Sequence, residues 1–188
     1  VAVIASDTRV DELNALHEAG VRGLRLNLSG ISHDIPEWTK ADTVWGAVHE
    51  LGWHLELHTD QGQLPKVLAQ LPSDISLVVD HMGKPTQAQV RDASLSVLIA
   101  RSQHAPTYVK LSGAYRLGHV DATNLARLWL HELGASALLW GSDWPCTNYE
   151  HLASYPDLFS ALQNWVGDVH LNQVLSLNPQ HLYWSSTV

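Results

Sequence analysis

Short apolar runs alternate with longer amphipathic segments along most of the 188-residue chain. Runs of about 4–8 residues that are apolar, or that alternate apolar and polar positions, are typical of strands. The pattern predicts six strands, at residues 1–5, 23–28, 53–59, 75–81, 107–112 and 137–141.

The segments between these strands repeat apolar residues every three or four positions, which is typical of helices with one buried face. In the longest of them, Val90, Ala93, Val97 and Leu98 share one side. Glycines close several segments, as expected for helix C-termini. The predicted helices cover about residues 8–19, 41–51, 64–71, 86–101, 121–133, 158–165 and 171–177, and the last is expected to stop at Asn178-Pro179.

Regular alternation of strands and helices predicts an α/β fold with a parallel sheet. Two architectures fit it: a doubly wound open sheet, and part of a (β/α)₈ barrel that needs two more strands. Periodicity does not choose between them. No glycine-rich phosphate loop follows a strand, which disfavours the nucleotide-binding version of the open sheet.

Composition narrows the class of protein. Apolar residues make up 45% of the chain and charged residues 16%, as in an ordinary globular domain. The net charge of -8 and the lack of a Lys/Arg block argue against nucleic acid or a membrane surface as partner. The lone cysteine, Cys146, excludes an intramolecular disulfide, and no signal peptide is visible, so we expect a cytoplasmic protein.

Polar side chains with catalytic potential stand where predicted strands end. His58, His81 and Asp143 each close a separate strand. Each one alone has an ordinary interpretation, as a satisfied core histidine or a turn-capping aspartate. Together they are more informative, because α/β proteins place their sites at the carboxyl ends of strands. Imidazoles and a carboxylate at one rim suit acid–base chemistry or metal binding.

A second polar set lies deeper in the predicted strands. Glu56 and Lys110 are both expected to point inward, and buried charges are costly unless they are paired. We predict an ion pair between them below the site, and a separation above about 6 Å would remove it. Cys146 follows Asp143 closely and is a candidate to line the site, whereas Trp144 is expected to pack at its rim.

Several segments carry a family resemblance. The sequences VVDHMGKP (78–85) and LWGSDWP (139–145) are the most specific, supported by GVRGLRLN (20–27), VKLSG (109–113) and the ending NPQHLY (178–183). With these motifs the whole chain resembles the amidohydrolase-related TIM-barrel hydrolases, in particular their 2-pyrone-4,6-dicarboxylate lactonase-like branch.

The resemblance implies a (β/α)₈ TIM barrel, with residues 1–188 as a single barrel domain that is N-terminally incomplete. The first two βα units are missing and strands three to eight are present. The family's first strand carries a His-x-His pair, and this chain has none. The outer edges of strands 1–5 and 137–141 are therefore expected to be unpaired or paired by another chain, so that an oligomer is possible.

The resemblance also implies an activity, the opening of a lactone ring in a small, carboxylated substrate. Asp143 would activate water as general base, and His81 would polarise the lactone carbonyl. The implied substrate-binding residues are Arg25, His58, Lys84 and Arg116.

Departures from the branch leave alternatives open. Residues 29–32 lack a second arginine, Cys146 stands where the dicarboxylate enzyme has a histidine, and His58 stands where it has a tyrosine. His58, His81 and Asp143 also fill three metal-ligand positions of the wider superfamily, so zinc is an alternative although no firm cofactor is implied. The alternative functions are a metal-dependent amidohydrolase, a nonoxidative decarboxylase, and an inactive truncated remnant.

Overall fold

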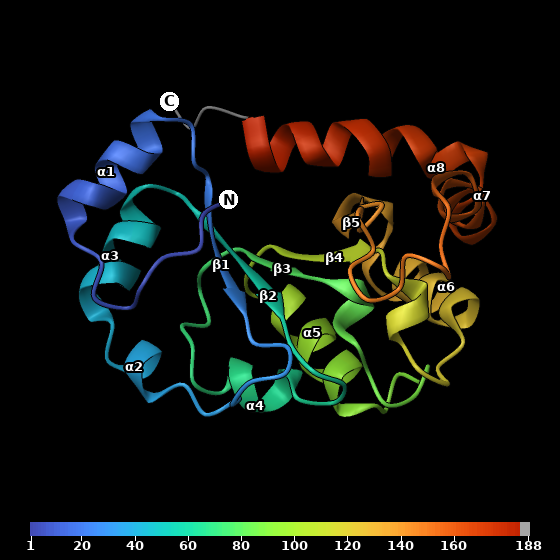
Figure 1. Ribbon diagram of the computed structural model, residues 1–188, viewed down its shortest axis with the longest axis horizontal. Coiled ribbons are helices and arrows are strands. Elements are labelled where there is room, and N and C mark those ends of the chain that lie inside the picture. Colours follow the sequence, from blue (N-terminus) through green and yellow to red (C-terminus); the bar gives the residue numbers. More distant parts are fainter. Residues whose placement is uncertain (185–188) are drawn as a thin grey trace.

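The computed structural model describes residues 1–184, which form one parallel sheet surrounded by helices (Figure 1). Five strands pair in the order in which they occur along the chain. They are β1 (Gly23–Asn27), β2 (His54–His58), β3 (Leu77–Val79), β4 (Thr107–Leu111) and β5 (Leu138–Trp140).

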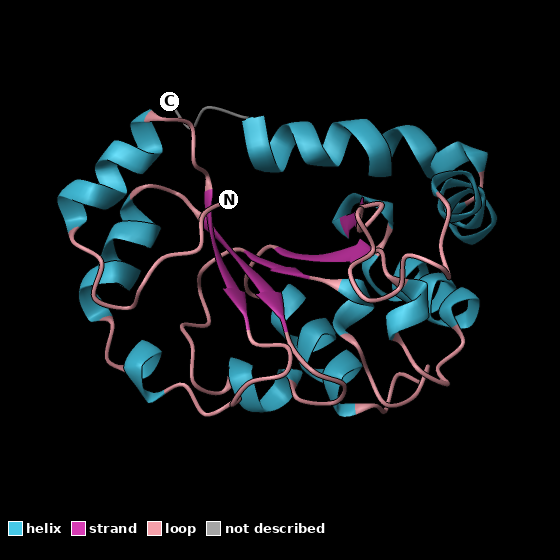
Figure 2. Ribbon diagram, in the orientation of Figure 1, coloured by secondary structure: helices cyan, strands magenta, loops and turns pink. Residues whose placement is uncertain are grey.

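Helices connect the strands and lie around the sheet, as Figure 2 shows. Short 3₁₀ turns, at His81–Gly83, Ala114–Arg116 and Ala135–Ala137, follow β3 and β4 and precede β5. The α-helices are α1 (Val10–Glu18), α2 (Pro36–Thr39), α3 (Asp42–Glu50), α4 (Leu64–Leu68), α5 (Ala93–Ser102), α6 (Ala122–Leu133), α7 (Tyr155–Val166) and α8 (Asp168–Asn172). Within residues 1–184, none of the helices combines the length and apolar character that crossing a bilayer requires.

The strand order decides between the two predicted architectures. A doubly wound sheet reverses its strand order at a switch point, whereas a barrel adds each new strand beside the preceding one. The order β1-β2-β3-β4-β5 never reverses. The chain therefore has the barrel type of α/β fold that its motifs indicate.

The prediction of a strand at residues 1–5 is wrong. Only Ala2 pairs with the sheet, through hydrogen bonds from Ala2 N to Gly23 O and from Arg25 N to Ala2 O. Val3 is 73% exposed, and the chain turns at Ser6-Asp7 on its way to α1. This bridge is thus all that covers the outer edge of β1, and β5 forms the opposite edge of the sheet in the part that the structure describes.

Alternation along the strands separates two faces. The leucines of β1 and β2, such as Leu24 and Leu55, belong to the apolar core beneath the helices. Their neighbours Arg25 and Glu56 pair in register on the other face, which in a barrel is the interior. The polar positions of the strands are thereby gathered on one side of the sheet.

The helix expected at residues 86–101 begins later, at Ala93. Asp92 is its N-cap and accepts a hydrogen bond from Ser94 N at 2.8 Å. The same carboxylate also binds Thr86 and Gln87, so residues 86–92 form a loop folded around it. Aspartate favours this capping role over an interior helical position.

The stop expected at Asn178-Pro179 is also wrong, because the chain stays helical from α8 to Trp184. Its π-helical turns, at Gln173–Leu177 and Gln180–Trp184, flank the proline. Asn178 does not form a turn, because its buried amide donates to Ala135 O and Leu138 O at 2.8 and 2.6 Å. This C-terminal segment lies on the side of the molecule opposite α4 and α5 (Figure 1). It brings the Tyr183 ring to 5.3 Å from that of His54, measured between centroids.

Candidate active site

Four charged side chains form a closed ring on the interior face of the sheet. Lys110 Nζ lies 2.8 Å from Glu56 Oε2 and 2.7 Å from Asp80 Oδ1. Arg25 Nη1 contacts Glu56 and lies 2.6 Å from Asp80 Oδ2. The predicted ion pair between Glu56 and Lys110 is confirmed, and two further residues extend it across four strands or strand ends.

Mutual pairing offsets the cost of burying Lys110 and Asp80. Burial alone would lower the pKa of Lys110, but the carboxylates of Asp80 and Glu56 raise that pKa above its ordinary value. Burial alone would raise the pKa of Asp80, but Lys110 and Arg25 hold it below its ordinary value. The ring is electrically neutral, which is the condition under which buried charges are tolerated.

Two histidines, at the carboxyl ends of β2 and β3, lie directly above this ion-pair ring of four charged side chains. The imidazoles of His58 and His81 meet edge to face with their centroids 4.6 Å apart. Both are buried, and burial is the main cause that lowers the pKa of each to about 4. Both imidazoles are therefore uncharged at neutral pH.

His81 is fixed from the neighbouring strand. Its Nδ1 lies 3.1 Å from the hydroxyl of Ser112, which is buried at the end of β4. The next residue, Gly113, has φ +57°, and a Cβ there would lie only 2.5 Å from His81 Nδ1. The His81 ring thus occupies space that only a glycine leaves free.

Asp143 faces His81 from the segment that follows β5. Its Oδ1 lies 3.9 Å from His81 Nε2. Its other oxygen, Oδ2, accepts hydrogen bonds from Tyr115 Oη at 2.8 Å and from Arg116 Nε at 2.6 Å. Burial raises the pKa of Tyr115, and its contacts with Cys146 and Asp143 raise it further, so the phenol stays protonated as a donor.

His81 and Asp143, which face each other, both have a left-handed backbone conformation. His81 has φ +50° and Asp143 has φ +57°. Residues other than glycine adopt this region at a cost of about 1–3 kcal/mol and concentrate at functional sites. The strain favours a functional interpretation of this pair over a packing one.

Lys84 lies in a separate network beside the site. Its Nζ is 3.8 Å from Asp60 Oδ1, and Asp60 also accepts hydrogen bonds from Ser29 Oγ and Gly30 N. The backbone N–H of Asp60 donates to His33 Nε2 at 3.1 Å. Burial is the main cause that lowers the pKa of Lys84, although Asp60 opposes it.

A cavity of about 340 Å³ opens above the ion-pair ring. Among the predicted site residues of the described chain, Arg25, His81 and Asp143 line it, and His58, Lys84 and Arg116 are not among its lining residues. The full lining comprises Arg25, Asp80, His81, Lys110, Ser112, Trp140, Gly141, Ser142, Asp143 and Trp144.

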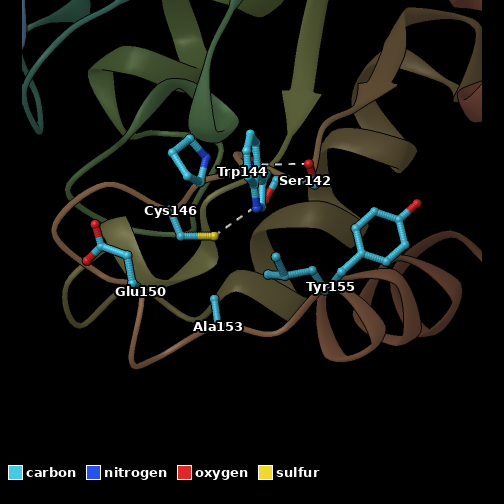
Figure 3. A pocket seen from close by; sticks show the side chains of 8 residues that line it. Ser142, Trp144, Cys146, Glu150, Ala153 and Tyr155 are labelled. Carbon is cyan, nitrogen blue, oxygen red and sulfur yellow. Dashed lines mark hydrogen bonds between the residues drawn. The ribbon is translucent and has the colours of Figure 1, made fainter.

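A second cavity of about 290 Å³ adjoins the first, and Figure 3 shows its wall. Ser142 and Trp144 line both cavities. Cys146 is buried and lines the second cavity rather than the first. Trp144 is 81% exposed, so the expectation that it packs at the rim is wrong. Its indole is instead a solvent-facing wall between the two cavities.

The two histidines and Asp80 have a donor set that fits a metal ion. One ligand atom from each of His58, Asp80 and His81 lies within 4.8 Å of the others. Among residues 1–184, no group donates to or accepts from the buried His58 Nε2 atom, so its lone pair or proton is unused. Imidazole and carboxylate are ligands that zinc accepts. Asp80, not Asp143, completes this group, and Asp80 also belongs to the ion-pair ring.

The structure brings His58, His81 and Asp143 together at one rim, and it pairs Arg116 with Asp143. Two residues at this rim received no role from the sequence, Tyr115 and Tyr149. Tyr115 could have been suspected from its place beside Arg116 after β4. Tyr149 lies in an irregular loop, where no periodic signal points to it.

Comparison with known proteins shows the family to which the chain is related. The amidohydrolase family model matches residues 1–183. The 2-pyrone-4,6-dicarboxylate hydrolase of Comamonas testosteroni is 28% identical over 208 aligned residues, covering 100% of this chain and 67% of that protein. The 4-sulfomuconolactone hydrolase of Rhizobium radiobacter is 28% identical, covering 92% of this chain and 61% of that protein.

A solved structure from Acinetobacter baumannii is also similar. It is described as a probable 2-pyrone-4,6-dicarboxylic acid hydrolase with citric acid bound, and it matches with a TM-score of 0.81 at 29% identity. The match covers 97% of this chain and 72% of that one. The chain thus spans about 61–72% of the length of these three relatives. Because the family model covers nearly all of the sequence and the strand order is that of a barrel, the chain belongs to the amidohydrolase family, and the predicted resemblance to its 2-pyrone-4,6-dicarboxylate hydrolase branch is confirmed.

Proposed function

We propose that this protein opens the ring of a small, carboxylated lactone by hydrolysis. The observation that carries the proposal is the opposition of Asp143 Oδ1 and His81 Nε2 across 3.9 Å at the mouth of the barrel. The two curated relatives described above are named as hydrolases of a pyrone dicarboxylate and a sulfomuconolactone, which supports this substrate class.

In the proposed reaction Asp143 is the general base. Tyr115 and Arg116 both bind its Oδ2, which leaves Oδ1 to accept a proton from water. A carboxylate within hydrogen-bond reach of water performs this task near neutral pH. The activated water attacks the lactone carbonyl and forms a tetrahedral species. Its ring C–O bond then breaks, and the leaving ring oxygen takes the proton from Asp143, which gives a new carboxyl group and a hydroxyl.

His81 stabilises the charge that develops on the carbonyl oxygen. The uncharged imidazole carries one proton, and Ser112 at Nδ1 can donate to that nitrogen and so leave the proton on Nε2. Nε2–H then points at the same gap as Asp143 Oδ1 and can donate to the developing oxyanion. Asp143 thus acts on the attacking water, and His81 acts on the carbonyl group that the water attacks.

Cationic side chains near the cavity supply the preference for an anionic substrate. Arg25 lines the cavity and retains partial exposure of its side chain at 26%. Lys84, from the loop after β3, is the second proposed contact for a substrate carboxylate, although Asp60 partly neutralises it. His58, beside His81, completes the proposed substrate-binding set. Because the chain as a whole carries a net charge of -8, which disfavours anions, cations gathered near this cavity are informative about the charge of the substrate.

A metal-dependent hydrolase is the second candidate, and the unpartnered His58 Nε2 favours it. His58, His81 and Asp80 would hold a divalent ion such as zinc, which as a Lewis acid polarises a carbonyl. Metal analysis of the purified protein discriminates between the two. One zinc per chain that is lost together with activity would establish metal dependence, and full activity of metal-free protein would exclude it.

The test of the proposed function is ring opening of 2-pyrone-4,6-dicarboxylate and 4-sulfomuconolactone by the purified protein, followed by absorbance. We expect Asp143→Asn to lower kcat by about 10²- to 10⁴-fold, since it removes the base. Asp42→Asn, at an exposed carboxylate in the first turn of α3, is the control and should leave kcat unchanged. Equal rates for the two variants would refute the role of Asp143.

A further inference from the structure

The Arg116 guanidinium lies against two tyrosine rings that also contact each other. Its Cζ is 5.4 Å from the centroid of the Tyr115 ring and 5.0 Å from that of the Tyr149 ring. The two rings are themselves 5.1 Å apart with an angle of 35° between their planes. Tyr115 precedes Arg116 on the turn after β4, whereas Tyr149 comes from the loop after β5. The side chain of Arg116 is only 15% exposed as a result.

The same loop that supplies Tyr149 also binds the edge of the guanidinium. Arg116 Nε donates to Asp143 Oδ2 at 2.6 Å, and Nη2 donates to Thr147 O at 3.2 Å. Loop residues 143–149 therefore hold Arg116 at three points, two on its edge and one on its face. An arginine held in this way has one orientation, because its planar fork and its π face are both engaged.

This arrangement bears on which oxygen of Asp143 is free. A carboxylate can rotate and offer either oxygen to water unless its donors fix it. Here the donors Tyr115 and Arg116 both engage Oδ2, and Oδ1 faces His81. The orientation of Asp143 thus depends on the orientation of Arg116, and Arg116 is held on its outer face by Tyr149.

We propose that Tyr149 is a positioning residue, which through the stacked Arg116 guanidinium keeps Oδ1 of Asp143 aimed at the reacting water. The proposal rests on the proposed function of Asp143. It assigns Arg116 to the orientation of the base, whereas the family resemblance alone assigns it to a substrate carboxylate. The aromatic ring of Tyr149, not its hydroxyl, performs the task, since a cation is attracted to the face of the ring.

The kinetic test compares Tyr149→Leu with Tyr149→Phe in lactone opening. We expect Tyr149→Leu to lower kcat by about 3- to 30-fold with KM unchanged, the range for loss of one cation–π contact. Tyr149→Phe keeps the ring and should retain the wild-type kcat. Thermal unfolding of both variants shows whether they fold. A rise in KM at constant kcat, or equal losses in the two variants, would overturn the proposal.

A second readout does not depend on turnover. The two nearby rings shift the NMR signal of the Arg116 Nε–H group, which Arg116→Lys identifies by its disappearance. The signal should move in Tyr149→Leu, which removes one of the two rings, and stay in place in Tyr149→Phe. An unmoved signal in Tyr149→Leu would refute the contact between Tyr149 and Arg116 on which the proposal depends. If the wild-type protein opens no lactone while the NMR result is as expected, the proposed function fails and the placement of Arg116 by Tyr149 stands.

Discussion

His81 owes its orientation to the two residues that directly follow β4, Ser112 and Gly113. Ser112 provides a hydroxyl at 3.1 Å from Nδ1, and Gly113 provides the empty space beside the ring. Neither residue carries a charge, and neither would be selected as functional from its type. Their importance follows from the positions they occupy next to an imidazole that is buried and neutral.

The space at Gly113 yields a prediction. In Gly113→Ala the new methyl group would lie 2.5 Å from His81 Nδ1, so the ring must move. We expect kcat for lactone opening to fall by about 10²-fold, as for a misplacement of about 1 Å. Gly20→Ala is the control, since Gly20 has φ +96° but no atom of the described residues lies within 4 Å of the added Cβ. Both variants should lose about 1–2 kcal/mol of stability from the left-handed backbone, and equal activities would contradict the assigned role of Gly113.

At this scale the sequence predicted the residues that end strands and missed those that act from loops. His58, His81 and Asp143 could be proposed because each closes an apolar run, and parallel strands bring their carboxyl ends together. The partner of Arg116 could not be predicted, because the course of residues 143–152 follows no period. The sequence therefore suggested that Arg116 binds a substrate carboxylate, whereas in the structure Arg116 binds the Asp143 carboxylate.

At the scale of elements, Asp92 determines where α5 begins. One of its oxygens caps the helix through Ser94 N, and the other accepts three hydrogen bonds from Thr86 and Gln87. The apolar spacing of Val90 with the helix suggested an earlier start, but Val90 is 43% exposed in the loop. A capping side chain thus outweighed periodicity, and the sequence contained that signal as an aspartate followed by Ala93-Ser94.

Asp92 also predicts a pH dependence of stability. Burial alone would raise its pKa, but the hydrogen bonds from Thr86, Ser94 and Gln87 outweigh burial and lower the pKa. The contribution of the carboxylate is therefore present above the unfolded value near 3.9 and is lost as the pH falls through the folded pKa. Asp92→Ala should lower the free energy of unfolding by about 1–2 kcal/mol at pH 7, and this deficit should shrink toward pH 3.

The measurement is urea unfolding of wild type and variant across that pH range. Asp92→Asn is the matched control, because its amide oxygen can still cap the helix and does not titrate. The difference between Asp92→Asn and Asp92→Ala should then be constant with pH. A wild-type advantage over Asp92→Ala that is independent of pH would show that the charge of Asp92 contributes nothing.

At the scale of the whole molecule, ion pairs between side chains connect the strands of the sheet in addition to the backbone hydrogen bonds. The ion-pair ring connects β1, β2 and β4 with the residue after β3, and the apolar positions of the same strands pack beneath the helices. The sequence predicted one side of this ring from the inward period of Glu56 and Lys110. It could not predict the closure by Arg25 and Asp80, which depends on the register between strands.

The ring should respond to mutation as a unit. Lys110→Met leaves Glu56 and Asp80 short of one positive charge, and we expect a loss of about 3–5 kcal/mol in the free energy of unfolding. Adding Glu56→Gln restores electrical neutrality. The double variant should therefore be more stable than the sum of the two single losses predicts, as measured by urea unfolding. Strictly additive losses would show that the four residues do not interact as a ring.

The position of an isotope in the product tests most directly whether water activated by Asp143 attacks a lactone carbonyl. Ring opening in H₂¹⁸O should place one ¹⁸O atom in the newly formed carboxylate, which mass spectrometry of product fragments locates. An isomerase would incorporate no solvent oxygen, and a decarboxylase would release carbon dioxide. The predicted result is label in the new carboxylate, formed by Asp143→Asn about 10²- to 10⁴-fold more slowly than by the wild type. Unlabelled product, or label in the hydroxyl group, would contradict attack by water on the carbonyl.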